Sequence, residues 1–372
     1  MVTNDSRHGA PEAPIVHVVG ARPNFPKMAP VEAALRAHQH SQLVVHTGQH
    51  FDTAMSETFF SDLGIPTPDV NLDVHGGSHA DLTARVMIGI DRFLDEVSPL
   101  GIVVYGDVNS TLAATLVAVK REVPVVHVEA GLRSGDRSMP EEINRIVVDA
   151  LADLLLATSP DAIDNLRREG RPDAAMRFVG NTMIDSLVTA LPHLPRHQDV
   201  VPGLPSRYAV ATFHRPANVD TPEAALAVVD TLRQLTEQVH VVLPLHPRSR
   251  APLDAAGLGN VDGVTLTSPL PYLEFIALVR GASLVVTDSG GIQEESTWLG
   301  VPCLTFRDST ERPITLTHGT NRLVGIGTFP AALRDALQTT GHDGPIPPRW
   351  DGHAGERAAA EISHFLSMRG SM

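Results

Sequence analysis

The stretch SLVVTDSGGIQEESTWLG, residues 283–300, contains the three features that decide the fold. Its apolar run SLVVT is typical of a strand that is buried on both faces. Two glycines, Gly290 and Gly291, follow the run, and the next residues are typical of a helix that carries Glu294 and Glu295 in its first turns. A strand, a glycine turn and a helix in this order predict one unit of a parallel α/β sheet.

Comparable apolar runs recur along the whole chain, separated by longer helical segments. In the first half they are IVHVV, LVVHT, IVVYG, VPVVHV, LLLAT and RFVGN, and in the second half YAVATF, VHVVLPL, VTLTS, SLVVT and VPCLTF. Nearly continuous apolar strands that alternate with helices predict parallel sheets covered on both faces. The runs are too numerous for one sheet of ordinary size, so we expect two doubly wound halves.

A proline-rich segment separates the two halves. Residues 189–207, TALPHLPRHQDVVPGLPSR, contain four prolines and no apolar periodicity, which is typical of a linker. We expect an N-terminal domain over residues 1–188, a C-terminal domain over residues 189–352, and a last helix over residues 353–372 that packs back on the N-terminal domain. Ligands of open parallel sheets bind at the carboxyl ends of the strands, which makes the residues after each strand the candidates for function.

The composition excludes several classes of protein. The chain has 372 residues, 42% of them apolar, and a formal net charge of −14, so it can form a full core but lacks the basic surface that nucleic acid requires. No stretch approaches the ~20 apolar residues of a membrane span, and the polar N-terminus has no apolar signal segment, so we expect a cytoplasmic protein. The single cysteine, Cys303, lies in the apolar run VPCLTF and is predicted to be a buried, unreactive thiol.

Polar side chains follow the predicted strands of the N-terminal half. Arg22 and Lys27 lie in GARPNFPKMAPV, a strand-to-helix loop in which cations and helix amides predict an anion site. Gln49 and His50 follow the second strand, where a lone histidine is as often structural as functional. Asp107 in YGDVNST either caps the next helix or takes part in chemistry, and the local pattern leaves both open.

A loop rich in charged residues follows VPVVHV. Glu129 is the first residue after this run, and Pro140 is predicted to open a helix with Glu141 in its first turn, four residues before Arg145. A surface ion pair between Glu141 and Arg145 would explain part of this pattern. The scarcity of apolar residues over positions 133–142 favours a functional loop instead.

The C-terminal half shows the same arrangement of polar residues after strands. His214 follows YAVATF, and His246 follows VHVVLPL. In the opening stretch, Ser289, Gly290 and Gly291 place bare backbone amides at the start of a helix, which suits a pyrophosphate. This half is therefore predicted to bind a phosphorylated ligand.

Two kinds of charged residue refine the prediction for this half. Arg312, one strand later, can neutralise phosphate charge, and Glu294 or Glu295 can accept hydroxyl protons from a ribose. The glycines do not form GxGxxG and no GxxxxGK[ST] is present, so neither a nicotinamide site nor an ATPase is predicted. We expect a nucleoside diphosphate in the second half.

Taken in order, these segments resemble the non-hydrolysing UDP-N-acetylglucosamine 2-epimerases. The similarity runs from GARPNFPKMAPV through TGQHFD, YGDVNST, HVEAGLRSGDRSMPEEINR, VGNT, FHRPANVD, LPLHPR and TDSGGIQEES to STERPITLTHGTN, roughly residues 15–330. The resemblance implies the GT-B architecture, two Rossmann-like doubly wound domains that face an interdomain cleft. It also implies a UDP-sugar substrate, a homodimer, and chemistry that needs no metal and no cofactor.

The reaction that the resemblance implies is the interconversion of UDP-GlcNAc and UDP-ManNAc. A proton leaves C2 and UDP leaves C1, so that 2-acetamidoglucal stays bound with UDP. UDP then adds back while C2 is reprotonated on the opposite face. Two acid/base groups on opposite faces explain the inversion, and stabilisation of the leaving group compensates for the weak acidity of the C2 proton.

The resemblance also assigns roles to individual residues. The implied catalytic residues are Asp107, Glu129, Glu141 and His214, of which the three carboxylates move protons around C2 and His214 lies near the sugar and the diphosphate. The implied UDP-binding residues are Arg22, Lys27, Arg145, Leu270, Tyr272, Ser289, Gly290, Gly291, Glu295 and Arg312. Within that set, Glu295 is expected at the ribose and the backbone near Leu270 and Tyr272 at the uracil.

One departure from the family concerns a second, allosteric UDP-GlcNAc. Some bacterial members have a REM-type stretch after TGQH that helps to bind this molecule, whereas the present chain has FDTAMSETFF. Gln49, His50 and His246 are present as candidate allosteric or cleft residues, but the later arginine of that site is not evident in NLDVHGGSHADL. Activation by substrate is therefore not predicted.

Four other activities stay open at this point. A hydrolysing relative would release ManNAc and UDP, but the matches to ERPIT and GTN favour the non-hydrolysing form. A 2-epimerase of a UDP-diacetamido uronic acid would share LHPR and MPEEINR, while the TERP segment favours UDP-GlcNAc. A GT-B glycosyltransferase would need an acceptor site, and a non-catalytic sensor would not need the full set of acid/base residues.

Overall fold

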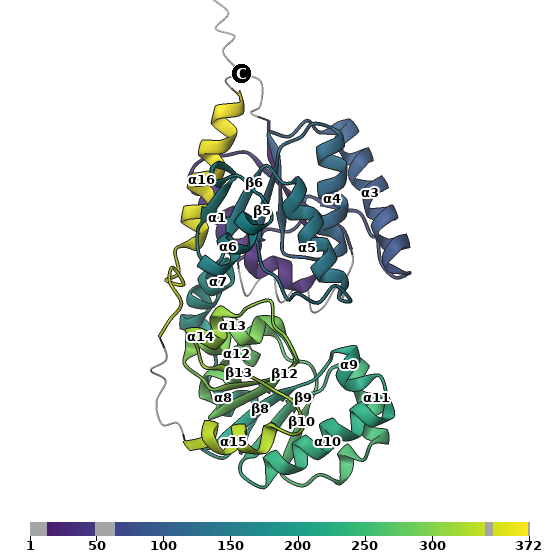
Figure 1. Ribbon diagram of the computed structural model, residues 1–372, viewed down its shortest axis with the longest axis vertical. Helices are drawn as coiled ribbons and strands as arrows, with labels where there is room; N and C mark the ends of the chain where they lie inside the picture. Colours follow the sequence, from purple (N-terminus) through teal and green to yellow (C-terminus); the bar gives the residue numbers. More distant parts are fainter. Residues whose placement is uncertain (1–12, 49–63, 339–344, 371–372) are drawn as a thin grey trace, which may run out of the picture.

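The computed structural model describes residues 13–48, 64–338 and 345–370. These residues form two α/β domains that lie one above the other in Figure 1. Each domain is built on its own parallel sheet with the Rossmann-like strand order, which confirms the predicted GT-B architecture. Gln49 and His50 lie outside the described residues.

The N-terminal sheet has seven parallel strands in the order β3-β2-β1-β4-β5-β6-β7. The strands are β1 (Ile15–Val19), β2 (Gln42–His46), β3 (Val70–Asn71), β4 (Gly101–Tyr105), β5 (Val125–Ala130), β6 (Leu154–Ala157) and β7 (Met176–Phe178). The helices that accompany them are α1 (Phe25–Ala37), α3 (His79–Glu96), α4 (Asn109–Lys120), α5 (Pro140–Leu151), α6 (Pro160–Arg168) and α7 (Thr182–Ala190).

The C-terminal sheet has six parallel strands in the order β10-β9-β8-β11-β12-β13. The strands are β8 (Tyr208–Thr212), β9 (His240–Pro244), β10 (Val264–Thr267), β11 (Leu284–Thr287), β12 (Cys303–Phe306) and β13 (Asn321–Val324). The helices in this part of the chain are α8 (His197–Val200), α9 (Pro216–Val219), α10 (Pro222–Thr236), α11 (Pro247–Ala255), α12 (Tyr272–Gly281), α13 (Gly290–Leu299), α14 (Ile314–Thr317) and α15 (Phe329–Gln338).

The quoted stretch forms strand β11 and helix α13, as predicted. Ser289 is the N-cap residue, and the helix begins at Gly290. The helix ends at Leu299, and the C-cap residue Gly300 has a φ of 71°. Glycine tolerates this left-handed conformation without a steric penalty, so the residue that stops the helix is also visible in the sequence.

The two strands that the sequence did not predict, β3 and β13, both lie at sheet edges. Strand β3 contains only two residues, and β13 carries the exposed Arg322. An edge strand is covered less completely than a central one, so it lacks the continuous apolar run that identified the other strands.

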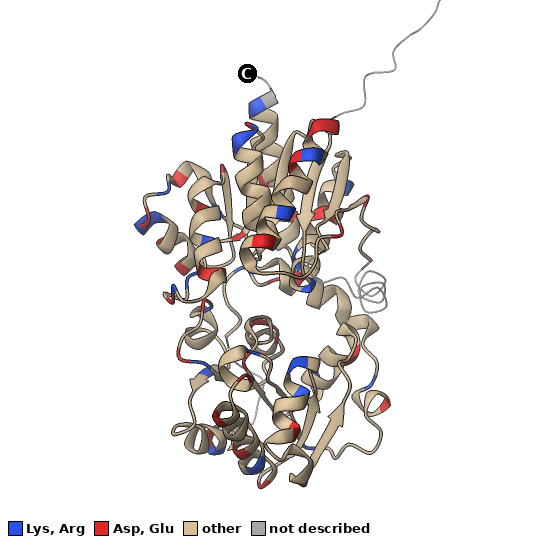
Figure 2. Cartoon of the chain, turned by 90° about the vertical axis from the view of Figure 1, so that its right-hand side faces the viewer, with Lys and Arg blue, Asp and Glu red and all other residues tan. Residues whose placement is uncertain are grey.

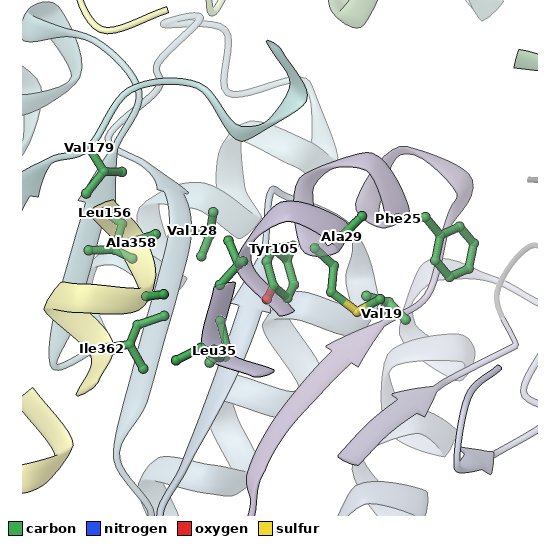
Figure 3. Packing of buried hydrophobic residues seen from close by; sticks show 14 of the residues in the cluster. Val19, Phe25, Ala29, Leu35, Tyr105, Val128, Leu156, Val179, Ala358 and Ile362 are labelled. Atoms are coloured by element: carbon green, nitrogen blue, oxygen red, sulfur yellow. The ribbon is translucent and has the colours of Figure 1, made fainter. Parts of the chain in front are cut away.

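The C-terminal helix α16 (Ala354–Gly370) returns to the N-terminal sheet. Figure 3 shows Ala358 and Ile362 of this helix in one core with Tyr105 and Leu156 of strands β4 and β6. Helix α16 also lies alongside α1, and a Cβ atom on Gly355 would come within 2.6 Å of the Pro30 carbonyl oxygen. Glycine at this position therefore allows the two helix backbones to approach closely.

Two further predictions concern the single cysteine and the lack of a membrane-spanning segment. Cys303 is completely buried in β12, so the expected burial is confirmed, and burial raises the pKa of its thiol to about 11. None of the described helices combines the length and apolar character needed to cross a bilayer.

The close contact between α16 and α1 predicts that Gly355→Ala destabilises the N-terminal domain. Helix propensity alone would favour alanine by about 1 kcal/mol, but the added methyl group meets backbone atoms and overpacking costs roughly 1–3 kcal/mol. Thermal unfolding should show a lower Tm for Gly355→Ala. Gly259→Ala is the matched control, because no heavy atom lies within 4 Å of its added Cβ. A Tm equal to or above that of the wild type for Gly355→Ala would contradict the prediction.

Candidate active site

The carboxyl ends of both sheets face the boundary between the two domains. In each sheet the strand order reverses at one point, between β1 and β4 in the first and between β8 and β11 in the second. Loops that follow strands at such a point form the usual ligand site of open parallel sheets. Figure 2 shows acidic and basic residues of both domains in this region. Of the residues predicted from the sequence, Asp107, His214 and Ser289 lie on these loops, whereas Lys27, Glu141, Arg145 and Glu295 lie in helices that follow strands of the two sheets.

Polar side chains of the two domains contact one another at this boundary. Arg312 Nη2 lies 3.5 Å from Glu129 Oε1, Arg145 Nη2 lies 3.8 Å from Glu311 Oε1, and the Asn181 amide donates to Glu294 Oε1 at 2.9 Å. In each contact one partner comes from the N-terminal domain and the other from the C-terminal domain. The structure therefore brings the two groups of predicted residues together.

Glu129 lies within strand β5. The sequence analysis had placed it after this strand. Its φ is +73°, and the pairing register with β6 shifts between Val128 and Ala130. Such a conformation costs a residue with a side chain about 1–3 kcal/mol, and it re-aims that side chain in the manner of a β-bulge. The Glu129 carboxylate is 2% exposed, and the ammonium of Lys27 contacts it at 2.7 Å.

Asp107 is not a helix cap. Helix α4 begins at Asn109 with Val108 as its N-cap, so the structural explanation considered for Asp107 is wrong. Its carboxylate forms an ion pair with Arg145. Burial acts to raise the pKa of Asp107, but Arg145 and Lys27 outweigh burial and lower it. Asp107 is therefore an ionised carboxylate at neutral pH.

Arg145 is buried and pairs with Asp107 and Glu142. The alternative of a surface ion pair with Glu141, which the sequence pattern left open but did not favour, is therefore wrong. Glu142 orders the charge-rich loop by accepting hydrogen bonds from the amides of Ser134 and Gly135, at 2.9 and 3.0 Å. The side chain of Glu141 stays half-buried in the first turn of α5. Glu141 therefore lies at the same edge of the sheet as Asp107 and is partly accessible.

His214 follows β8 and is held by Asp288, which follows β11. The two side chains meet at 2.8 Å between Nδ1 and Oδ1, and Asp288 also accepts the backbone N–H of Arg215 at 2.9 Å. Burial acts to raise the pKa of Asp288, but His214 outweighs it and lowers the pKa. Asp288 therefore fixes the orientation of the His214 ring at the switch point of the second sheet. Sequence reasoning did not single out Asp288, although it directly follows the quoted strand.

His246 lies beside His214, with 5.9 Å between the ring centroids. Its Nδ1 accepts the Arg248 amide at 3.2 Å and so caps α11. Burial and the neighbouring His214, Arg248 and Arg22 lower the pKa of His246. The contribution of Arg22, which belongs to the 3₁₀ turn after β1, shows that this residue of the first domain lies near the second domain.

The two glycines in the first turn of α13 let other side chains approach the helix closely. A Cβ on Gly290 would lie 2.8 Å from Arg312 Nη1, so glycine lets the guanidinium approach the helix start. A Cβ on Gly291 would lie 3.2 Å from the terminal carbon of Met183 in α7. Helix amides and a guanidinium close together are groups with which proteins commonly stabilise an anion.

A buried cluster of charges surrounds Arg312. Its Nε lies 2.9 Å from Glu294 Oε2, and it also pairs with Glu311. Glu311 in turn contacts Arg307 at 2.6 Å. Burial acts to raise the pKa of Glu311, but Arg312, Arg307 and Arg145 outweigh it and hold the pKa far below its ordinary value. The sequence analysis found Arg312 but not Glu311 or Arg307.

Two adjacent carboxyl groups of α13 are buried behind these cations. Burial raises the pKa of Glu294 to about 7 and the pKa of Glu295 to about 8. Glu295 forms a hydrogen bond with Tyr272, which begins α12, and Leu270 is half-buried just before that helix. Burial therefore favours the neutral form of Glu295.

The described residues contain no group of three or more His, Cys, Asp and Glu side chains placed to hold a metal ion. The groups that converge here are carboxylates of the first domain and cations, a histidine and helix amides of the second. Such a set can bind an anionic ligand and move protons.

Comparison with known proteins supports a specific family. A sequence model of the UDP-N-acetylglucosamine 2-epimerase family matches residues 33–363. The chain is 42% identical to the UDP-2,3-diacetamido-2,3-dideoxy-D-glucuronate 2-epimerase of Pseudomonas aeruginosa over 95% of this chain and 99% of that protein. It is 38% identical to the UDP-N-acetylglucosamine 2-epimerase of Methanocaldococcus jannaschii over 83% of this chain and 87% of that protein.

A solved structure gives the same result. The crystal structure of the Methanocaldococcus jannaschii UDP-GlcNAc 2-epimerase in complex with UDP-GlcNAc and UDP superimposes with a TM-score of 0.88 and 35% identity. The match covers 94% of this chain and 99% of that one. The family model, the relatives and the fold agree along most of the chain, and the chain belongs to the UDP-N-acetylglucosamine 2-epimerase family.

Proposed function

We propose that this protein interconverts UDP-GlcNAc and UDP-ManNAc by eliminating UDP and adding it back at C1. The observation that carries the proposal is the convergence of Asp107 and Glu129 from the first sheet with Arg312 and the start of α13 from the second. The related Methanocaldococcus jannaschii enzyme, which has UDP-GlcNAc and UDP bound in its structure, supports the choice of substrate.

The C-terminal domain is proposed to hold UDP. The helix start at Ser289, Gly290 and Gly291, together with Arg312, would favour the diphosphate, and Lys27 adds a cation from the other domain. Glu295 would bind the ribose hydroxyls, and the backbone near Leu270 and Tyr272 would meet the uracil. Arg22 and Arg145 supply further positive charge at the boundary.

The N-terminal domain is proposed to supply the proton-transfer groups. Asp107 is ionised and therefore suited to accept the C2 proton, while Glu129 and Glu141 supply further carboxylates near the boundary. The C2 proton is weakly acidic, so departure of UDP must be assisted by the cations that neutralise its growing charge. His214, oriented by Asp288, would act beside the diphosphate.

We propose the non-hydrolysing reaction, in which UDP stays bound until it adds back to the glucal. Retention of UDP is supported by the cations of both domains that meet at the site, because an anion held by both is less readily lost. We expect a cytoplasmic homodimer that needs no cofactor. In the hydrolysing alternative, water would take the place of UDP in the second step.

A second candidate substrate is a UDP-diacetamido uronic acid. The observation that favours it is the 42% identity with the Pseudomonas aeruginosa enzyme, over nearly the full length of both chains. The same elimination at C2 would serve this substrate, so the site chemistry does not distinguish it from UDP-GlcNAc.

Proton NMR of the purified protein with UDP-GlcNAc in D2O tests the proposed function. We expect UDP-ManNAc to accumulate to a constant ratio, with deuterium at C2 of both sugars and without any added cofactor. Accumulation of free ManNAc and UDP would instead establish the hydrolysing reaction. Turnover of the UDP-diacetamido uronic acid alone would establish the second candidate and contradict the first.

Replacement of the proposed base tests the assignment of Asp107. Asp107→Asn keeps the shape of the side chain but removes its charge, so C2 deuterium exchange should slow roughly 10²- to 10⁴-fold. The matched control is Asp153→Asn, since Asp153 also pairs with an arginine, Arg369 at 2.6 Å, but lies at the opposite end of β5, beside Val125. Wild-type exchange in Asp107→Asn, or an equal loss in both variants, would overturn the assignment.

A further inference from the structure

Two buried side chains, His127 and Asp149, contact the backbone segments that carry Asp107 and Glu129, and the proposed reaction does not use them. His127 of β5 and Asp149 of α5 are both completely buried, with 2.6 Å between Nδ1 and Oδ1. The other ring nitrogen of His127, Nε2, lies 2.8 Å from the carbonyl oxygen of Gly106. The pair thus reaches from α5 to the residue that precedes Asp107.

Asp149 also contacts the segment that follows Glu129 in the sequence. Its Oδ2 accepts the backbone N–H of Gly131 at 3.0 Å and contacts Arg133 Nη1 at 2.8 Å. His127 and Gly131 lie two residues before and two residues after Glu129. Asp149 therefore ties down both sides of the residue whose backbone is left-handed.

Both ring nitrogens of His127 face atoms that can only accept hydrogen bonds. Gly106 offers a carbonyl oxygen, and Asp149 offers a carboxylate, because His127 and Arg133 outweigh the effect of burial and lower the pKa of Asp149. The ring of His127 is thus held between a backbone oxygen and a buried carboxylate.

A buried pair of polar side chains contributes little to stability compared with apolar packing of similar volume, because both groups lose their hydration. Stability alone therefore gives a weak reason for this pair in the centre of an apolar sheet. Its hydrogen bonds instead end on the two backbone segments that carry Asp107 and Glu129. This placement indicates a role in positioning.

We propose that His127 and Asp149 are positioning residues that keep Glu129 in its left-handed conformation and hold the loop of Asp107 in register with it. The inference rests on the proposed function and adds residues that touch neither substrate nor UDP. Because the UDP-binding groups lie mostly in the other domain, disturbing the pair should lower kcat and leave UDP binding unchanged. Misplacement of a reacting group by about 1 Å can cost roughly a hundredfold in rate.

The test compares Asp149→Asn and His127→Gln with a control, His17→Gln. His17 is equally buried in the neighbouring region of the sheet and also forms two side-chain hydrogen bonds, to Tyr105 Oη at 2.7 Å and Gln42 Oε1 at 2.8 Å, but it contacts neither catalytic loop. We expect kcat to fall about 10- to 100-fold in Asp149→Asn and His127→Gln. Their KM for the UDP-sugar and Kd for UDP should stay within about twofold of the wild type, and His17→Gln should keep wild-type kcat.

Amide hydrogen exchange measured by NMR supplies a readout that does not depend on turnover. Gly131 and Glu129 should exchange faster in Asp149→Asn and His127→Gln than in the wild type, and at the wild-type rate in His17→Gln. Asp149→Asn keeps the side-chain shape, so it remains testable if His127→Gln does not fold. Wild-type kcat in Asp149→Asn, or a parallel loss of kcat and UDP affinity, would overturn the inference.

These outcomes are separable from failure of the proposed function. If the wild type neither exchanges C2 hydrogen nor binds UDP, the proposed function is wrong. In that case, faster exchange of Gly131 and Glu129 in both variants would still support the positioning of these loops, and unchanged exchange would contradict it.

Discussion

The left-handed backbone of Glu129 is the constraint on which the organisation of the site depends. A strand residue with a φ of +73° is strained, and this one lies at a register shift between β5 and β6. The strain is offset by what surrounds it, since Lys27 and Arg312 contact the carboxylate and Asp149 holds the flanking backbone. A strained conformation that is retained at such a point is a sign of function rather than of packing.

The same carboxylate links the two domains. Glu129 meets Arg312, which in turn pairs with Glu294 and with Glu311, and Glu311 is surrounded by arginines of both domains. Buried charges of this kind are costly unless they are paired, so the domain boundary is most stable when every charge has a partner. A diphosphate bound there would compete with the carboxylates for Arg312. We therefore expect binding of UDP to be coupled electrostatically to the groups that are proposed to move protons.

The fold was predictable from the sequence because central strands and helix starts leave local signals. The run before Asp288 and the glycines after it are enough to predict β11 and α13, and Gly300 marks the helix end. The edge strands β3 and β13 were missed because their sequences lack continuous apolar character.

The site was predictable in part. Strand-end residues such as Asp107 and His214 were found because parallel strands end at one edge, but their partners depend on tertiary contacts. Arg145 and Glu141 have the spacing of an ion pair on one helix, whereas Arg145 pairs with Asp107 on another loop. Asp149 gave no local signal, because a carboxylate near the end of a helix is usually solvated.

The central claim is that Glu129 is held in a strained conformation for chemistry, and the most direct measurement compares Glu129→Gly with Glu129→Ala. Both variants lose the carboxylate, so the difference between their free energies of unfolding reports the effect of the backbone conformation at position 129. In an ordinary strand glycine is less stable than alanine by roughly 0.5–1 kcal/mol, whereas at positive φ it avoids a penalty of roughly 1–2 kcal/mol. We predict that Glu129→Gly is the more stable variant and that neither variant exchanges C2 hydrogen. A more stable Glu129→Ala, or wild-type exchange in either variant, would contradict this account.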